Sequence, residues 1–457
     1  MGAHNGFRRQ RGVKIAFVTL GCKLNYAETS TYERDFASAG LEPVSWRDGA
    51  DVFVVNTCTV TATANKKSRS EIRKLHRINP NAPIIVTGCY AQMKPEEVEA
   101  IEGVKMVVGT EDKAVLVERT LGLLGIKVAG KNGAEGRQTE GGAEGFAQGR
   151  QVDSSGQVNT AVTERSNIFG AYSSGERTRS FLKVQDGCDN FCRYCIVPYA
   201  RGRSRNIPIC QAVKYAQEIA SKGIKEIVLT GVNTGDFGRS TGESFLDLLK
   251  ALNGVDGIER YRISSIEPNL LTNDIIDWIA SGTKFQPHFH IPLQVGCDEL
   301  LSSMGRKYTT VEFAEKIEYI RHAMEGPGKP LVFFGIDVMA GLPGESEELF
   351  LKSYNFLEKI KPAFIHIFPY SKRPGTPAAV MPAQTSPKVK ASRVARLEEL
   401  SSRLHSEFIE ANKGIRERVL WESREKDGTM AGYTGNYIRL SRPYEKNKVN
   451  TIEEVVI

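Results

Sequence analysis

The sequence predicts an α/β protein built from a doubly wound α/β domain, a central partial (βα)6 barrel and a C-terminal small β-module. Short apolar, β-branched runs alternate with helical stretches between residues 13 and 126, and again between residues 179 and 380. Continuous apolar runs are typical of strands buried in a parallel sheet. From residue 415 onward, strand-like runs are joined by turn residues without helices between them, which is typical of a small all-β unit.

The first domain is expected at residues 13–126. Its parallel strands are predicted at KIAFVTLG (14–21), DVFVVNT (51–57) and APIIVTG (82–88), with helices at TYERDFASAG and KSRSEIRKLHRI. Alternation of buried strands and helices predicts a doubly wound sheet, in which ligands bind at the carboxyl edge.

Residues 127–178 are predicted to be a flexible Gly-rich linker. GKNGAEGRQTEGGAEGFAQGRQVDSSGQVNT is polar and nearly free of large apolar residues. Such a composition buries too little surface to offset the entropy of ordering.

The central domain is expected at residues 179–414. Its six strand candidates are SFLKVQ (180–185), EIVLTGV (226–232), RYRISSI (260–266), FHIPLQV (289–295), FFGIDVMAG (333–341) and FIHIFPY (364–370). Six βα units are too few to close an eight-stranded barrel, so we expect an open one with its chemistry at the carboxyl ends of the strands. A helix then begins at Ser386-Pro387 and is closed by Gly414.

The last part, residues 415–457, has strand-like runs at RVLW, NYIRL and EEVVI and an Asp-Gly turn signal. We expect a small β-barrel module here.

Composition restricts the class of protein. No run of about 18 apolar residues occurs, and the basic N-terminus lacks the apolar core of a signal peptide, so we expect a cytoplasmic protein with no membrane partner. The net charge of +7 fits a polyanionic partner. Eight cysteines in 457 residues are too few for a disulfide scaffold, so their spacing decides their role.

Three cysteines form the motif CDNFCRYC, a CxxxCxxC directly after a predicted strand: Cys188, Cys192 and Cys195. Three thiolates on one short loop can hold a 4Fe-4S cluster and leave one iron open to a ligand. The alternative is a structural zinc site, which needs a fourth ligand, and no other His or Cys lies close by. The spacing therefore favours the cluster.

Three further cysteines, Cys22, Cys58 and Cys89, each directly follow a predicted parallel strand. The carboxyl ends of parallel strands share one edge, so we expect these thiols to meet there and hold a second cluster. The alternative is three unrelated core cysteines. Asn25, with Asn56 and Thr57, flanks this edge and could bond the sulfurs or simply form turns. Cys210 and Cys297 lack partners at ligand spacing and are interpreted as structural.

Further candidates follow the predicted barrel strands at the same end. As cofactor contacts we single out Tyr194, Gly231, Asn233, Ser265, Gln294, Gly341 and Gly344. Basic and aromatic residues suited to phosphates and bases are candidates for RNA binding. They are Arg201, Arg203, Arg205, Arg416, Arg418, Tyr433 and Arg439.

These motifs resemble the methylthiotransferase family of radical S-adenosylmethionine enzymes over nearly the whole chain. The resemblance is carried by TLGCKLNYAET (19–29), DGCDNFCRYCIVPYARGRSR (186–205), TGVNTGDFG (230–238) and LQVGCDELLSSMGRKYTT (293–310). Within the family these segments look most like the branch that acts on N6-threonylcarbamoyladenosine at position 37 of tRNA. The linker is longer than is usual in the family, and the terminal module is shorter than the usual RNA-binding TRAM domain.

The resemblance implies two 4Fe-4S clusters, with S-adenosylmethionine as radical source and methyl donor. The cluster on Cys188, Cys192 and Cys195 would generate a 5′-deoxyadenosyl radical that removes the hydrogen at C2 of the adenine. The cluster on Cys22, Cys58 and Cys89 would supply the sulfur. The implied partners are a tRNA anticodon stem-loop, a one-electron donor and a sulfur donor, and we expect a monomer.

Two alternatives stay open at this point. The acceptor could instead be isopentenyladenosine in tRNA or an aspartate of a ribosomal protein. A different class of protein, a non-catalytic RNA-binding protein with structural zinc, would have the same cysteines without iron.

Overall fold

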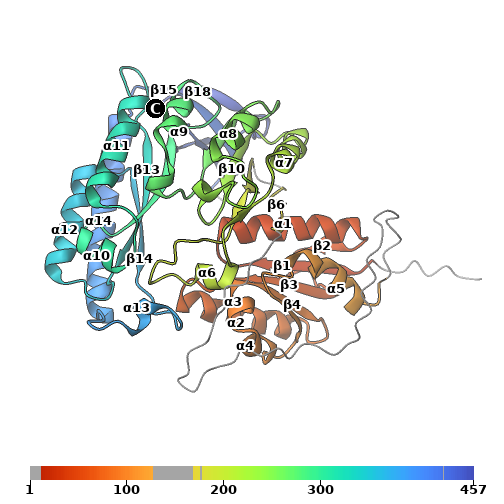
Figure 1. The fold of residues 1–457 in the computed structure, drawn as a ribbon. Helices are drawn as coiled ribbons and strands as arrows, with labels where there is room; N and C mark the ends of the chain where they lie inside the picture. The colour runs from red at the N-terminus through yellow and green to blue at the C-terminus, as the bar shows by residue number, and fades with distance from the viewer. Residues whose placement is uncertain (1–11, 127–167, 175–177, 426) are drawn as a thin grey trace, which may run out of the picture. The chain divides into compact units, whose positions relative to one another are not determined.

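The computed structural model describes residues 12–126, 168–174, 178–425 and 427–457 (Figure 1). These residues form two compact units. The first comprises residues 12–20, 32–59 and 63–126, and the second comprises residues 21–31, 60–62 and those from 168 onward. The first residues of helix α1, which follow Cys22, thus belong to the second unit. None of the helices described here is long and apolar enough to cross a membrane.

A five-stranded parallel sheet of order β2-β1-β3-β4-β5 is the centre of the first unit. Its strands are β1 (Lys14–Thr19), β2 (Glu42–Val44), β3 (Val52–Thr57), β4 (Ile84–Gly88) and β5 (Val104–Val108). The three predicted strands are confirmed, and they are the adjacent central ones. The sequence prediction missed β2 and β5 at the edges, which are short or only partly buried and so lack a continuous apolar signal.

Helices lie on both faces of this sheet, as the doubly wound prediction requires. They are α1 (Lys23–Ser38), α2 (Ala62–Ile78), α3 (Cys89–Met93), α4 (Pro95–Glu99), η1 (Lys113–Val115) and α5 (Leu116–Leu123). Ile72 and Leu75 of α2 join the buried cluster that contains Phe53. Phe36 of α1 packs on Phe17, with ring centroids 5.9 Å apart.

Six parallel strands form the open barrel of the second unit. They are β7 (Arg179–Lys183), β10 (Glu226–Thr230), β11 (Arg260–Ile263), β12 (His288–Gln294), β13 (Phe333–Ala340) and β14 (Phe364–Pro369). They pair as β11-β10-β7 and as β12-β13-β14. A parallel bridge between Tyr261 and Phe285 joins the two sets. The partial (βα)6 barrel is therefore confirmed.

Additional short strands lie beside the barrel: β6 (Ala171–Tyr172), β8 (Gln185–Asp186) and β9 (Arg205–Asn206). Strand β6 pairs with β7, so the prediction of a linker as far as residue 178 was wrong for residues 168–174. The physical reason is burial, because Ala171 and Tyr172 are both buried. Residues 127–167 of the predicted linker lie outside the described residues.

Helices and short helical turns follow and connect the barrel strands. They are α6 (Val197–Arg201), α7 (Ile209–Ser221), η2 (Thr234–Asp236), α8 (Phe245–Asn253), η3 (Pro268–Leu270), α9 (Asn273–Ala280), α10 (Asp298–Ser303), α11 (Thr310–Met324), α12 (Glu347–Ile360), α13 (Pro377–Val380) and α14 (Pro387–Ala411). Apolar residues such as Ile227 and Ile336 point outward into the core with these helices. Since side chains alternate along a strand, the polar residues between them face the barrel interior.

The C-terminal module is a four-stranded antiparallel sheet of order β17-β16-β15-β18. Its elements are β15 (Arg416–Arg424), β16 (Thr429–Tyr433), β17 (Arg439–Pro443), η4 (Lys446–Lys448) and β18 (Ile452–Val456). Among the described residues β17 and β18 stay unpaired edges, so the module is an open sheet rather than the predicted small barrel.

This sheet is attached to the amino ends of the barrel strands by two buried arginines of β11. Arg260 donates to the carbonyl of Tyr433 (2.9 Å), and Arg262 donates to the carbonyl of Gly435 (2.7 Å). Arg262 also pairs with Glu226 of β10 at 2.9 Å. The opposite, carboxyl ends of the strands remain available for a site.

Candidate active site at the carboxyl ends of the barrel strands

The CxxxCxxC loop begins where β8 ends, at a turn that only glycine can make. Gly187 has φ +74°, and a Cβ there would collide with the carbonyl oxygen of Arg203. The N–H of Cys188 donates to the carbonyl of Gly202 (3.1 Å), which closes the base of the loop. The loop is therefore held at both ends before any metal binds.

The three thiols of this loop lie close enough to influence one another. Burial, together with the nearby charges of Asp236 and Cys192, raises the pKa of Cys188 to about 12. Burial also raises the pKa of Cys195, again with Cys192 as a contributing charge. Three mutually repelling thiolates, two buried and Cys195 half-buried, are unfavourable unless a cationic centre binds them, since metal ligands must be deprotonated. The donor set therefore fits an iron–sulfur cluster.

Backbone and side-chain N–H groups already point at the sulfurs. The N–H of Asn190 lies 3.5 Å from Cys188 Sγ, and the N–H of Val197 lies 3.4 Å from Cys195 Sγ. Hydrogen bonds to cluster sulfurs and ligand thiolates are one way in which proteins set a cluster's potential.

Arg306 contacts this site, and the sequence reasoning did not single it out. Its guanidinium donates to Cys192 Sγ (3.2 Å) and to the hydroxyl of Tyr194 (3.3 Å). It also pairs with Glu267 at 2.5 Å and donates to Tyr308 at 2.6 Å. Only the segment MGRKYTT, quoted for the family resemblance, contained a signal for this residue.

The predicted cofactor contacts all lie at or beyond the carboxyl ends of the barrel strands. Gly231 and Asn233 follow β10, Ser265 follows β11, Gln294 ends β12, and Gly341 and Gly344 follow β13. Gln294 has φ +71° beside a register shift of β12, an unusual backbone for a residue other than glycine. Such strain in a non-glycine residue is frequent at binding sites.

At least one polar group of this site is free to bind a ligand. The Nδ2 of Asn233 is buried and has no hydrogen-bond partner among the described residues. Its Oδ1 accepts from the N–H of Glu267 (3.2 Å), which orients the amide. Gly231 is required here, because a Cβ would lie 2.7 Å from Gln185 Oε1. A donor held in this way suits a zwitterionic ligand such as S-adenosylmethionine.

The other cysteines occupy the carboxyl edge of the N-terminal sheet. Cys58 follows β3 and Cys89 begins α3, directly after Thr57 and Gly88, which are paired across the two strands. Gly88 has φ +98°, and a Cβ would lie 2.6 Å from Asn56 Oδ1. The Thr57 hydroxyl donates to the carbonyl of Thr87 (2.6 Å), so it stabilises the strand ends rather than a sulfur.

Cys22 follows β1 by three residues and begins the second unit. Its thiol donates to Oδ1 of Asn25 at 3.7 Å, and the same oxygen accepts from Arg201 at 2.6 Å. Asn25 therefore contacts a sulfur.

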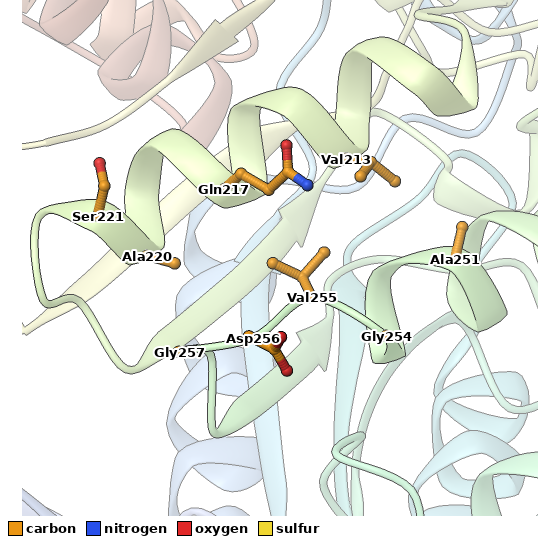
Figure 2. Close-up of a pocket in the computed structure, with 9 residues that line it drawn as sticks. All are labelled: Val213, Gln217, Ala220, Ser221, Ala251, Gly254, Val255, Asp256 and Gly257. Carbon is orange, nitrogen blue, oxygen red and sulfur yellow. The ribbon is translucent and has the colours of Figure 1, made fainter.

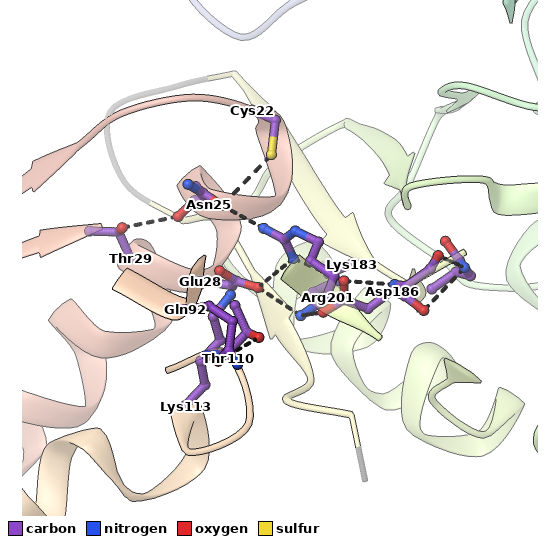
Figure 3. Close-up of polar contacts among 12 residues, drawn as sticks. Cys22, Asn25, Glu28, Thr29, Gln92, Thr110, Lys113, Lys183, Asp186 and Arg201 are labelled. Atoms are coloured by element: carbon purple, nitrogen blue, oxygen red, sulfur yellow. Dashed lines mark hydrogen bonds and ion pairs between the residues drawn. The ribbon is translucent and has the colours of Figure 1, made fainter. Parts of the chain in front are cut away.

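A buried ionic cluster lies next to Asn25 (Figure 3). Lys183 of β7 pairs with Glu28 of α1 and with Asp186, each at 2.7 Å. Arg201 pairs with Asp186 at 2.9 Å and with Glu28 at 3.3 Å. Figure 3 shows these four side chains pointing toward one another. The cluster connects the helix after Cys22 with the strand before the CxxxCxxC loop.

The assignment of Arg201 and Arg205 to RNA binding was wrong. Arg201 is 2% and Arg205 4% exposed. Arg205 donates to the carbonyl of Arg201 (2.7 Å), and both guanidiniums face Asp186. In the sequence, RGRSR looks like an exposed basic segment. In the structure, Arg201 and Arg205 instead neutralise buried carboxylates. Arg203 is exposed and remains a candidate.

The candidates on the C-terminal sheet have partners within the protein. Arg416, Arg418 and Arg439 pair with Glu454 (3.7 Å), Glu259 (3.0 Å) and Glu425 (2.6 Å). All three arginines stay exposed, so phosphates could still reach them. The Tyr433 ring is stacked beneath the Arg179 guanidinium at 4.7 Å, an internal contact that competes with base stacking.

A surface hollow of about 530 Å³ lies between α7 and α8 (Figure 2). Small and apolar residues line it, among them Val213, Ala220, Val255 and Gly257. Gly257 precedes β11, so the hollow lies at the amino ends of the strands, away from the cysteines. It is not part of the site.

Comparison with known proteins agrees with this arrangement. The model of the radical SAM superfamily matches residues 182–357, and the model described as Uncharacterized protein family UPF0004 matches residues 14–109. Among solved structures, the radical S-adenosylmethionine methyltransferase TsrM from Kitasatospora setae, with cobalamin and a 4Fe-4S cluster bound, matches with a TM-score of 0.55 at 16% identity. The match covers 81% of this chain and 74% of TsrM, and it bears on the fold alone.

Curated relatives match nearly the full length. The threonylcarbamoyladenosine tRNA methylthiotransferase MtaB of Bacillus subtilis is 40% identical, over 97% of this chain and 93% of the relative. MtaB of Aquifex aeolicus is 36% identical, over 94% and 97%. The tRNA-2-methylthio-N(6)-dimethylallyladenosine synthase of Dictyoglomus thermophilum is 32% identical, over 93% and 91%. With two matching family models and full-length relatives of this kind, the chain belongs to the MtaB-type radical S-adenosylmethionine methylthiotransferase family.

Proposed function

We propose that this protein adds a methylthio group to C2 of N6-threonylcarbamoyladenosine at position 37 of tRNA, producing the 2-methylthio derivative. The observation that carries the proposal is the set of three thiols on the loop after β8, two of them buried and Cys195 half-buried, in a chain similar to MtaB over 97% of its length. As a member of its family the protein uses an iron–sulfur cluster and S-adenosylmethionine.

Each cluster has a proposed ligand set. Cys188, Cys192 and Cys195 would hold the first, and Cys22, Cys58 and Cys89 the second, from which sulfur is transferred. With S-adenosylmethionine bound, the first cluster would supply radical chemistry that no side chain can perform. The chain's own residues position this centre. Arg306 and Asn190 donate toward the sulfurs, and Asn233 offers a buried donor to the cofactor. Tyr194, Ser265, Gln294, Gly341 and Gly344 are proposed to complete the pocket.

The RNA partner is proposed to bind through its phosphates. Arg203 next to the cluster loop and the exposed Arg416, Arg418 and Arg439 are the candidate contacts. Base 37 must turn out of its stack for C2 to reach the interior of a barrel, at a cost of about a few kcal/mol. A one-electron donor and a sulfur donor complete the partners, and we propose a monomer acting in the cytosol, where tRNA is modified.

The experiment is mass spectrometry of tRNA from a deletion strain complemented with this gene. Complementation should restore 2-methylthio-N6-threonylcarbamoyladenosine. Restoration of the 2-methylthio-isopentenyl nucleoside, or of a methylthiolated ribosomal protein, would assign a different acceptor.

The cysteine assignments are tested on the reconstituted protein. Two clusters predict about eight irons per chain, whereas a zinc-containing RNA-binding protein would be colourless. Cys192→Ala should abolish S-adenosylmethionine cleavage. Cys58→Ala should spare cleavage and stop sulfur insertion. Cleavage that survives Cys192→Ala would remove the role of this loop.

A further inference from the structure

Three polar side chains gather on the inner face of β12, β13 and β14, away from the cysteine loop. Asp337 of β13 and His366 of β14 are paired across the two strands. His290 Nε2 lies 2.7 Å from Asp337 Oδ1, and the rings of His290 and His366 are 5.0 Å apart. One polar atom from each residue lies within 4.8 Å of the other two. Asp337 thus orients one imidazole, and the second imidazole lies beside this pair.

These side chains face a space rather than the core. Their strand neighbours Ile336 and Ile365 point the opposite way and are 0% and 2% exposed. His290, Asp337 and His366 are only half-buried. On the same face of β14, Phe368 is 46% exposed. The barrel is therefore open beside β14, and the inner face combines an aromatic wall with hydrogen-bonding groups.

A lysine of helix α1 lies near this cluster. Lys23, at the start of α1, is close enough to Asp337 and His366 for its charge to act on both. Its side chain is solvent-accessible. It directly follows Cys22, a proposed ligand of the cluster from which sulfur is transferred.

We propose that Lys23, with His290, Asp337 and His366, forms a pocket for the threonylcarbamoyl group on N6 of the substrate adenine. The inference rests on the proposed function and extends it to the determinant of substrate choice. The group carries a carboxylate, a hydroxyl and a ureido unit. Lys23 pairs with the carboxylate, and the His366 imidazole and Asp337 bond the hydroxyl and ureido groups, while His290 is held between Asp337 (2.7 Å) and the Ser265 hydroxyl (3.3 Å).

The geometry of adenine supports this placement. C2 and C6 are the two carbons that flank N1, so the reacting carbon and the N6 substituent share one edge of the base. A base whose C2 faces the cluster at Cys22 would therefore extend its N6 substituent toward the neighbouring Lys23. No other arrangement is needed to bring the substituent to the polar face.

The pocket would also explain the rejection of an apolar substituent. An isopentenyl group would displace water from Lys23 and the His290–Asp337 pair without offering hydrogen bonds. A site built to hydrogen-bond its substrate discriminates strongly against an analogue that lacks the partner groups, because buried polar groups are left unpaired.

The test measures binding of fluorescent anticodon stem-loops to the reconstituted holoenzyme. One stem-loop carries N6-threonylcarbamoyladenosine, a second has a carboxamide in place of the carboxylate, and a third has unmodified adenosine. The wild type should prefer the acid over the amide by about tenfold or more. Lys23→Gln should bring this ratio close to one. His366→Phe should reduce the preference for the modified over the unmodified stem-loop. Comparing ratios cancels the phosphate contacts, which all the stem-loops share.

Controls separate this pocket from general effects. Lys250→Gln on the outer helix α8 removes the same charge from an exposed position and should leave the ratios unchanged. Iron content and 5′-deoxyadenosine formation without RNA report whether each variant is folded and loaded. His366 is distant in sequence from every proposed cluster ligand, so this variant tests the pocket even if Lys23→Gln disturbs Cys22.

If the affinity ratios between stem-loops are unchanged in both variants and iron is retained, the pocket proposal is overturned while the proposed function stays intact. Stoichiometric zinc or manganese that is lost in His366→Phe would assign the three side chains to a metal and overturn it as well. A wild type that methylthiolates only the isopentenyl stem-loop would instead remove the proposed function, and the pocket with it.

Discussion

Arg306 shows how one side chain can serve both the stability of the site and the properties of its cluster. It contacts Cys192 Sγ and pairs with Glu267, whose pKa is raised by burial and lowered by this guanidinium. We predict that Arg306→Met costs about 3 kcal/mol, because Glu267 loses its partner. The cluster potential should become more negative, because an N–H and a positive charge leave the sulfur. Thermal unfolding and a redox titration followed by electron paramagnetic resonance check the two effects. Arg306→Lys keeps the positive charge, so its cluster potential should lie between those of the wild type and Arg306→Met. A potential that is unchanged in Arg306→Met would show that this contact does not set it.

Gly187 provides a second prediction at the residue scale. Gly187→Ala should prevent cluster assembly, because the new Cβ collides with the carbonyl of Arg203 at a positive φ of 74°. Gly223 is a matched control, since it has φ +76° but open space around the Cβ position. Gly223→Ala should cost only about 1–2 kcal/mol, the penalty of the left-handed backbone. Iron per chain after reconstitution measures the difference. Equal iron contents in the two variants would show that the close approach is unimportant.

At the scale of elements, an ionic cluster links the first turns of α1 to β7. Glu28 and Lys183 have no exposed side-chain surface. We predict that Glu28→Leu destabilises the protein by about 3–5 kcal/mol, because Lys183 and Arg201 lose a buried counter-charge. Urea unfolding measures this change. Glu398→Gln on the exposed side of α14 is the control and should stay within about 0.5 kcal/mol. If the loss of unfolding free energy in Glu28→Leu is as small as in the control, the structural role of the ionic cluster is contradicted.

The same cluster explains where sequence reasoning fails at this scale. The strands of the barrel were predictable because buried parallel strands are continuous apolar runs. The polar residues of these strands have no such signal. Lys183, Glu226 and Arg262 are buried inside the barrel, and each depends on a partner from another strand or helix. Partners this far apart in the chain cannot be paired from spacing.

At the scale of the whole molecule, the attachment of the C-terminal sheet makes stability depend on pH. Burial opposes ionisation of Glu226, but Arg262 and Arg179 hold its pKa below the ordinary value. A carboxyl with a lowered folded pKa stabilises the protein above its unfolded pKa of roughly 4.3 and loses this contribution as the pH falls through the folded value. The protein should therefore lose stability on acidification below about pH 4. Glu226→Gln should be less stable near neutral pH and should lose this part of the acid dependence. Unfolding free energies at several pH values check it, and an identical slope in the variant would contradict the assignment.

The sequence by itself determined the kinds and order of the parts and the spacing of the cysteines. Hydrophobic periodicity is local, so the three central strands of the N-terminal sheet and the six barrel strands could be located from short windows. The CxxxCxxC spacing is also local, since three ligands within eight residues must share one loop. These features needed no knowledge of distant contacts.

Only the tertiary structure decided which charged residues are available to a partner. The arginines at 201 and 205 are near neighbours in the chain of Arg203, yet Arg203 is exposed and the other two are buried against Asp186. The contacts of Arg306 were likewise visible only in the structure. So was the grouping of His290, Asp337 and His366 on three strands. The physical reason is that burial and counter-charges depend on residues distant in the chain, which the fold brings together and local spacing does not record.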